Sequence, residues 1–526
     1  MASLLNIKLL PKSNGIRNDD EIQCTSRKSA SENFFSIFRR NVIGNWQVFE
    51  SPFGKKEIIY ADWTASGRTY QPIEECMQRE IMPFLANTHT GATITGTLMS
   101  KAYDKAKTII KEHVHANNND ALIFCGSGMT GAVNKLQRIL GMRMPERIAD
   151  YVKKKSDLQL DEALKPIVFV THMEHHSNQV SWLETIADVE IIKRGANGNV
   201  DLEHFKSLLE QFRCRKNKIA AVTACSNVTG IQTPYHEIAK MVHEYAGLCF
   251  VDFACSAPYI NMDMHPAEHG AHLDAIYFSP HKFLGGPGTP GVLIFNTKMY
   301  KNSIPDQPGG GTVFYSNPWK VQEYVTNIEQ REDGGTPPFL QGIKAAMCIR
   351  LKADMGVENM LRRDEEMLQV IFERFSKIKN IEILEGHIRK RLGVIAFIVK
   401  GAHYNLIVKI LNDRFGIQTR GGCSCAGTYG HMLLHVDEVR SHEILHSIRS
   451  GNLLCKPGWV RLSVHPTMSN AEIDFIIDAI ELTASHFREW MKDYTYDAES
   501  NEYSFKGFEQ KEHNKIEDWF NVNNWK

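Results

Sequence analysis

Short apolar runs alternate with longer amphipathic stretches from about residue 58 to residue 300, and this alternation most constrains the fold. The short runs suit buried strands and the stretches between them have helical periodicity. The pattern predicts an α/β domain with a mainly parallel sheet and helices on both faces. We expect strands at residues 57–61, 121–124, 166–171, 189–192, 219–223, 249–252, 275–278 and 292–295, and helices at 101–115, 130–140, 202–212 and 235–245.

The pattern changes after residue 300. Gly/Pro-rich passages at 304–312 and 333–338 precede one long helical pattern at 341–377, strands at 393–399 and 460–464, and a helix at 470–486. This order predicts a smaller α+β domain after the large one. We expect a partly disordered N-terminal arm over 1–50, a large domain over 51–335, a small domain over 336–490 and a charged tail over 491–526.

Composition excludes several classes of protein. The 526 residues carry 61 Lys+Arg and 61 Asp+Glu, so no net charge indicates a nucleic-acid partner, and no apolar run reaches membrane-spanning length. The 11 cysteines are scattered and no secretory signal is evident, which favours reduced thiols and a cytoplasmic location. The first 40 residues mix acids with bases, unlike a typical transit peptide, but organelle targeting stays open.

A lysine between a strand and a glycine-rich turn is the first chemical signal. Lys282 follows the expected strand at 275–278 and precedes the turn at 285–288, while Asp252 ends the expected strand at 249–252. A desolvated lysine amine can form an imine with an aldehyde, and an aspartate can keep a pyridine nitrogen protonated. This pair predicts a site for pyridoxal 5'-phosphate (PLP).

A glycine turn between the strand at 121–124 and the helix at 130–140 suits an anion. Backbone N–H groups around Gly128 would point toward the ligand at a helix N-terminus, and Ser127 and Thr130 add hydroxyl groups. The turn lacks the Gly-Lys-Ser/Thr ending of a nucleotide-binding P-loop. An ordinary strand–helix turn is the alternative.

Two further segments carry reactive side chains. His175 follows the strand at 166–171 and could stack on a cofactor ring and exchange protons, although a surface loop is the alternative. No complete ligand set accompanies it, so we expect no metal. Cys423 and Cys425 lie in a glycine-flanked loop after Arg420, whose charge favours a nucleophilic thiolate. A buried structural cysteine pair or half of a zinc knuckle are the alternatives.

Taken together and in this order, these segments resemble the class V aminotransferase superfamily of fold-type I PLP enzymes, and within it the cysteine desulfurase and selenocysteine lyase group. The resemblance covers roughly residues 55–485. It rests on Met-Glu-His-His at 173–176, Ser-Asn-Val-Thr-Gly at 226–230, Val-Asp at 251–252, Ser-Pro-His-Lys at 279–282, Gly-Gly-Thr-Pro at 334–337 and Arg-Leu-Ser at 461–463.

The resemblance implies roles for individual residues. Lys282 would hold the cofactor covalently, Asp252 would pair with its ring nitrogen, and His175 would stack on its ring. Arg461 would bind the substrate carboxylate, with Arg420 nearby, and Cys425, rather than Cys423, would accept sulfur. Thr336 would reach the cofactor of a neighbouring subunit, which implies a homodimer. The remaining cofactor contacts would come from Ser127, Gly128, Thr130, Asn227, Ser279 and His281.

The sequence also departs from that group. Cys255 occupies the position of the group's glutamine, so the usual hydrogen bond to the cofactor ring oxygen is either missing or supplied by Ser256. About twenty extra residues also precede Arg461. The leading hypothesis is removal of sulfur from L-cysteine, giving alanine, a persulfide on Cys425 and transfer to an acceptor protein. The alternatives are transamination, epimerisation or lyase chemistry on another amino acid, and a non-enzymatic scaffold.

Overall fold

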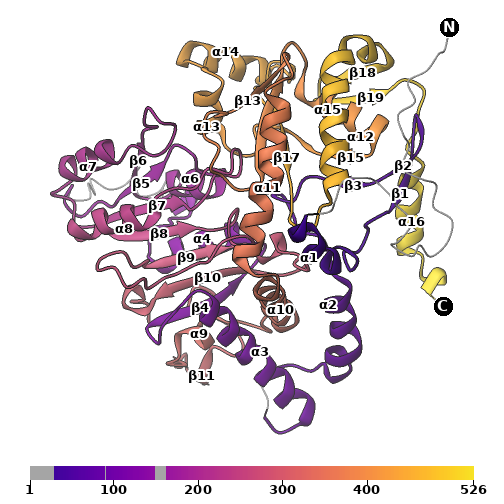
Figure 1. Ribbon diagram of the computed structural model, residues 1–526. Helices are drawn as coiled ribbons and strands as arrows, with labels where there is room; N and C mark the ends of the chain where they lie inside the picture. The colour runs from indigo at the N-terminus through magenta and orange to yellow at the C-terminus, as the bar shows by residue number, and fades with distance from the viewer. Residues whose placement is uncertain (1–28, 89–90, 149–161, 526) are drawn as a thin grey trace.

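A seven-stranded sheet forms the centre of the protein in the computed structural model, which describes residues 29–88, 91–148 and 162–525 (Figure 1). Its strand order is β4-β10-β9-β8-β7-β5-β6. β10 runs antiparallel to both of its neighbours and the other adjacent pairs are parallel, which confirms the mainly parallel α/β prediction. The strands are β4 (Asp120–Cys125), β5 (Ile167–Thr171), β6 (Asp188–Ile192), β7 (Lys218–Thr223), β8 (Leu248–Asp252), β9 (Ala275–Phe278) and β10 (Gly291–Asn296).

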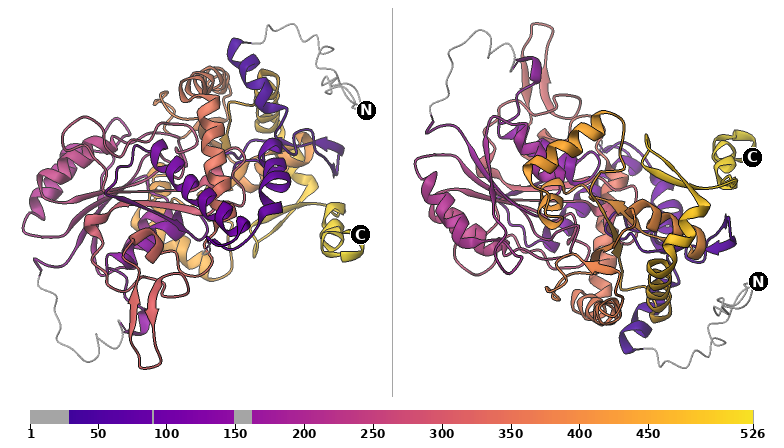
Figure 2. Two further views of the ribbon diagram at one scale, coloured as in Figure 1. Left: turned by 90° about the horizontal axis from the view of Figure 1, so that it is seen from below. Right: turned by 90° about the horizontal axis from the view of Figure 1, so that it is seen from above.

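Both faces of this sheet are covered, because alternate side chains of each strand enter different apolar cores. In β4, Ile123 joins one buried cluster while Leu122 and Phe124 join the other. Figure 2 shows the helices on the two sides of the sheet. They are α3 (Ile94–His113), α4 (Met129–Ile139), α6 (His176–Leu183), α7 (Leu202–Gln211), α8 (Tyr235–Glu244) and α10 (Phe339–Met355).

A second, antiparallel sheet forms in the C-terminal part, in the order β13-β14-β17-β16. It comprises β13 (Ile381–Ile383), β14 (Val394–Val399), β17 (Trp459–Ser463) and β16 (Arg420–Gly422), with helices α11 (Val357–Phe375), α12 (Tyr404–Phe415) and α15 (Asn470–Trp490). The prediction of a single helix over 341–377 is wrong. α10 and α11 are separate helices, because Gly356 adopts a positive φ of 71° between them.

The first expected strand also belongs elsewhere. β3 (Ile59–Tyr60) pairs in parallel with β15 (Ile417–Gln418), so it is not a strand of the central sheet. A short apolar run indicates a strand but does not specify its partner. Of the expected N-terminal arm, residues 1–28 lie outside the described residues, and α1 (Ala30–Arg39) buries Phe35 and Phe38 against the core.

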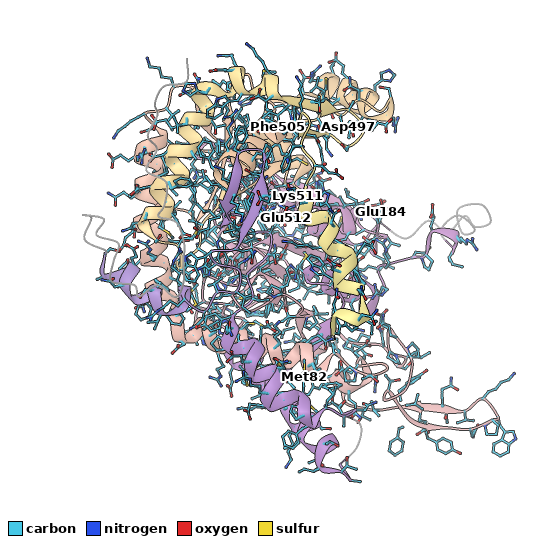
Figure 3. The ribbon with its side chains drawn as sticks, turned by 90° about the vertical axis from the view of Figure 1, so that its right-hand side faces the viewer. Met82, Glu184, Asp497, Phe505, Lys511 and Glu512 are labelled. Atoms are coloured by element: carbon cyan, nitrogen blue, oxygen red, sulfur yellow. The ribbon has the colours of Figure 1, made fainter. Side chains whose placement is uncertain are left out.

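The last residues form the hairpin β18 (Tyr494–Asp497) and β19 (Glu502–Phe505). Glu512 then accepts a hydrogen bond from the Glu50 N–H at 2.9 Å, and Figure 3 shows this part of the tail beside the hairpin β1 (Val48–Ser51) and β2 (Gly54–Glu57). The tail is therefore attached to the N-terminal segment. The other elements are α2 (Gln71–Cys76), β11 (Val313–Ser316), β12 (Gln322–Tyr324), α9 (Ile328–Arg331), α13 (Gly427–Leu433), α14 (Glu438–Arg449) and α16 (Lys515–Phe520).

Among the described residues, none of the helices has both the length and the apolar surface needed to cross a membrane.

Candidate active site

A cavity of about 470 Å³ lies at the carboxyl ends of the central strands, where loops from the large sheet meet the second sheet. Most of the residues that the sequence singles out share this cavity. Neither Gly128 nor Thr336 is part of its lining, although a Cβ on Gly128 would meet His281 and Ser279, which are part of it. The predicted residues that line it are Ser127, Thr130, His175, Asn227, Asp252, Ser279, His281, Lys282, Arg420, Cys423, Cys425 and Arg461.

Lys282 and Asp252 both line this cavity from the ends of adjacent strands. Lys282 ends the 3₁₀ turn Pro280–Lys282 after β9, and Asp252 is the last residue of the adjacent strand β8. Burial lowers the pKa of the Lys282 ammonium, although Cys255 and Asp252 partly offset this effect. Burial raises the pKa of Asp252 to about 6, against the opposing effects of the Ala254 N–H and Lys282. A buried carboxylate of this kind favours a cationic partner.

The turn between β4 and α4 forms a compact polar cradle. The Met129 N–H donates to Ser279 Oγ at 2.8 Å, and Thr130 Oγ1 lies 2.7 Å from Ser177 Oγ. Gly128 has a φ of 74°, and a Cβ there would lie 2.7 Å from His281 Cε1. Only glycine fits this close approach without a shift. The cradle therefore combines the N-terminus of α4 with hydroxyl groups, which suits an anion.

His175 caps the N-terminus of α6, because its Nδ1 accepts a hydrogen bond from the Ser177 N–H at 3.1 Å. Burial and the nearby Lys282 lower the pKa of His175 to about 3. The ring therefore stays neutral near pH 7. Because Nδ1 uses its lone pair as an acceptor, Nε2 of the neutral ring carries the hydrogen, so the ring is suited to stacking and to donating a hydrogen bond at Nε2.

Asp62 joins the two arginines of the cavity, and the sequence analysis missed it. Its Oδ1 lies 2.8 Å from Arg461 Nη2, and its Oδ2 lies 2.9 Å from Arg420 Nε. Arg461 also donates from Nη1 to the Asn227 carbonyl at 3.2 Å, while its Nε has no partner among the described residues. Asp62 follows β3, and both the unexpected β3–β15 pairing and a bridge from Asp62 to Ser463 of β17 bring it to this place.

The loop that carries Cys425 is fastened at several points. The His176 N–H donates to the Cys425 carbonyl at 2.7 Å, and His176 Nε2 accepts the Gly427 N–H at 2.9 Å. Asn227 Nδ2 donates to the Ser424 carbonyl at 2.7 Å. Cys425 is exposed and has a φ of 57°, so its thiol reaches solvent from a left-handed backbone position.

A second thiol pair lies deeper in the cavity. Cys225 and Cys255 both line it, and both thiols lie 3.6 Å from the Ser226 carbonyl oxygen. The hydrogen bond from Cys225 lowers the pKa of Cys255, whereas burial raises that of Cys225. Cys255, and not Ser256, lines the cavity. The position where the resembling group has glutamine thus presents a thiol.

The C-terminal hairpin also reaches the cavity, which the sequence analysis did not anticipate. Asn501 lies at the turn between β18 and β19 and lines the cavity with Tyr404 and Asn405. Its Nδ2 donates to Tyr404 Oη at 2.9 Å, and its carbonyl accepts Asn405 Nδ2 at 2.6 Å. No motif in the tail signals this placement, because the contact depends on the tertiary position of the hairpin.

Comparison with known proteins agrees with this fold. The family model "Aminotransferase class-V" matches residues 59–476. A probable cysteine desulfurase of Halalkalibacterium halodurans is 26% identical over 388 residues, which are 72% of this chain and 86% of the relative. A probable cysteine desulfurase of Staphylococcus aureus is 26% identical over 400 residues, covering 75% of this chain and 89% of the relative. The protein therefore belongs to the class V aminotransferase family, whose members are PLP-dependent enzymes.

Solved structures give the same fold. The ligand-free cysteine desulfurase of Thermococcus onnurineus superposes with a TM-score of 0.67 at 21% identity and covers 85% of this chain and 98% of its own. A cysteine desulfurase of Escherichia coli gives a TM-score of 0.62 at 19% identity, with 81% and 94% covered. These comparisons confirm the fold-type I architecture and the family expected from the sequence.

Proposed function

We propose that this protein removes sulfur from L-cysteine, forming alanine and a persulfide on Cys425. The observation that carries the proposal is that Lys282, Asp252 and Cys425 border one cavity. The curated relatives named as probable cysteine desulfurases support it, since they match across most of their length.

The residues present fit PLP. The α4 cradle suits its phosphate, and the buried Asp252 carboxylate suits its protonated ring nitrogen. Asn227 Oδ1 is buried without a hydrogen-bond partner among the described residues, so it can accept a polar group of cofactor or substrate. In this proposal Lys282 attaches the cofactor and His175 stacks on its ring, and Ser127, Ser279 and His281 surround the phosphate. When bound, PLP supplies a ring that withdraws electrons from the substrate α-carbon.

In this proposal, separate residues of the chain bind the substrate, transfer the proton and attack the sulfur. Arg461 binds the substrate carboxylate with its guanidinium fork, and Asp62 keeps that fork oriented. Lys282, whose lowered pKa favours the free amine, takes and returns the α-proton. The Cys425 thiolate attacks the substrate sulfur, so a sulfur–sulfur bond forms while the carbon–sulfur bond breaks. The β-carbon keeps the bonding electrons and takes up the proton that the Cys425 thiol released, and alanine leaves. An acceptor thiol then takes the outer sulfur.

Thr336 supports a proposal of two cooperating subunits. It does not line its own cavity, and its Oγ1 accepts a hydrogen bond from Asn87 Nδ2 at 3.3 Å. We propose that it completes the cofactor site of a second copy in a homodimer. Sedimentation of wild type and Thr336→Ala, with cofactor retention measured on both, tests this role.

The experiment that tests the function is a turnover assay with L-cysteine on purified, PLP-loaded protein. With excess dithiothreitol to reduce the persulfide, alanine and sulfide should appear in equal amounts, and without the reductant mass mapping should find the added sulfur at Cys425. Lys282→Ala should abolish both products, and Cys425→Ala should abolish persulfide formation. Cys455→Ala is the matched control, since this thiol is also exposed but lies outside the cavity lining.

One observation favours a second candidate function. Cys255 changes the wall of the cavity beside Lys282, and a different side chain there can suit a different amino acid. Transamination, epimerisation or lyase chemistry on another substrate is this candidate. Full turnover by Cys425→Ala, together with activity on another amino acid in a substrate panel, would replace desulfuration with this alternative.

A further inference from the structure

Two imidazole rings and a carboxylate lie together away from the candidate active site. His243 is in the last turn of α8, and His272 and Asp274 lie in the segment that leads into β9. Asp274 precedes the amino end of β9, whereas Lys282 follows its carboxyl end. The two sites therefore lie at opposite ends of this strand. We call His243, His272 and Asp274 the His-Asp cluster.

The geometry of the cluster matches that of a ligand set. His243 Nε2 lies 2.9 Å from Asp274 Oδ2, and His272 Nε2 lies 3.8 Å from Asp274 Oδ1. The two rings stack with centroids 4.1 Å apart and an interplanar angle of 12°. One ligand atom from each residue lies within 4.8 Å of the other two. Donor atoms this close can share a single cation after small side-chain rotations.

The hydrogen bonds of His243 determine which of its nitrogens can bind a cation. Its Nδ1 lies 2.6 Å from the Gly270 carbonyl oxygen, and a carbonyl only accepts, so Nδ1 carries the hydrogen. Without an ion, the ring donates from Nε2 to Asp274 when it is protonated, and this hydrogen bond raises the pKa of His243 against the effect of burial. A cation between Nε2 and the carboxylate would take the place of that proton. A histidine that donates its second ring N–H to a backbone carbonyl is the usual arrangement around a protein-bound metal.

The surroundings orient the carboxylate and leave an entrance. Asp274 Oδ2 accepts the Cys249 N–H at 2.8 Å, which fixes the carboxylate at the start of β8. The side chain of His272 is 45% exposed, whereas those of His243 and Asp274 are 14% and 10% exposed. An ion can therefore reach the cluster from solvent, and water can complete its coordination.

We propose that the His-Asp cluster binds one divalent transition-metal cation of the zinc class, held by two imidazole nitrogens and one carboxylate. Imidazole and carboxylate ligands with a remaining water position suit Zn²⁺, Co²⁺ or Ni²⁺ better than Ca²⁺ or Mg²⁺, which prefer oxygen ligands alone. The ion would join the end of α8 to the segment before β9. It is a structural site, separate from the chemistry at Lys282.

Titration of PLP-loaded, chelator-treated protein with Zn²⁺ and with Co²⁺ tests this site. His272→Ala is the test variant, because its side chain is 45% exposed and its removal costs little beyond the stacking on His243. His486→Ala is the matched control, since the side chain of His486 is 43% exposed on α15. Wild type and control should bind one ion per chain, and His272→Ala should bind it at least about tenfold more weakly.

Two further measurements distinguish the cluster from the thiols of the chain. Co²⁺ bound by nitrogen and oxygen should lack the thiolate-to-metal absorption that a cysteine ligand produces. Zn²⁺ should also raise the unfolding temperature of wild type and His486→Ala but not of His272→Ala, because an ion that binds the folded state stabilises it. Equal affinity of His272→Ala and wild type, a thiolate absorption band, or no bound ion would each overturn the proposal.

Discussion

Replacing Asp62 with alanine should show how much the buried ion pair between Asp62 and Arg461 contributes to the free energy of unfolding. Asp62 contacts Arg461, whose side chain is 4% exposed, and Arg420, whose side chain is 52% exposed. Removing one member of a buried ion pair costs about 3–5 kcal/mol, because the other charge stays buried without a partner. An exposed pair contributes only about 0–1 kcal/mol. The two contacts of one carboxylate should therefore differ strongly.

Asp62→Ala should lower the free energy of unfolding by about 3–5 kcal/mol, and Arg420→Gln by no more than about 1 kcal/mol. Urea denaturation followed by circular dichroism measures both variants against wild type under one set of conditions. Asp62→Ala should also raise the KM for L-cysteine, since Arg461 loses its orientation. Equal destabilisation by the two variants, or a loss under about 1 kcal/mol for Asp62→Ala, would refute the reasoning.

Three other changes have defined outcomes. Asp252→Asn should weaken retention of PLP by roughly 10- to 100-fold, the equivalent of about 1.5–3 kcal/mol for a charge-assisted hydrogen bond, as measured by cofactor absorbance after dialysis. Burial lowers the pKa of His465 to about 3 in the folded state, while the unfolded chain takes up the proton below about pH 6.5. The free energy of unfolding should therefore fall with pH below about 6.5, by up to about 1.4 kcal/mol per pH unit. His465→Gln should flatten that part of a stability–pH curve, and an unchanged slope would contradict this. His176→Ala removes the acceptor of the Gly427 N–H and should change the alkylation rate of Cys425 while leaving borohydride trapping at Lys282 intact.

The sequence was sufficient to predict the elements that local patterns determine. Strand ends carrying Asp252 and Lys282 lie side by side because parallel strands bring their carboxyl ends to one edge. Gly128 could also be recognised from the sequence, because the turn between a strand and a helix needs a residue that tolerates a positive φ. These parts of the site depend on neighbours in sequence and on one simple topology.

The missed parts depend on contacts between distant segments. Asp62 reaches the arginines because β3 pairs with β15 and Asp62 bridges to Ser463 of β17, and Asn501 reaches the cavity through the position of the last hairpin. Neither residue lies in a motif with a recognisable period or spacing. The break at Gly356 was missed for a different reason, since helical periodicity continues on both sides of one residue that ends a helix.

The anchoring of the cysteine loop has a consequence for sulfur delivery. Hydrogen bonds to His176 and Asn227 hold residues 424–427 beside the cavity instead of leaving them on a long swinging arm. A persulfide sulfur on Cys425 would therefore stay beside the cavity. If Cys425 carries sulfur as proposed, an acceptor would have to bring its own thiol to that point, and the shape of the acceptor would decide whether it can receive the sulfur.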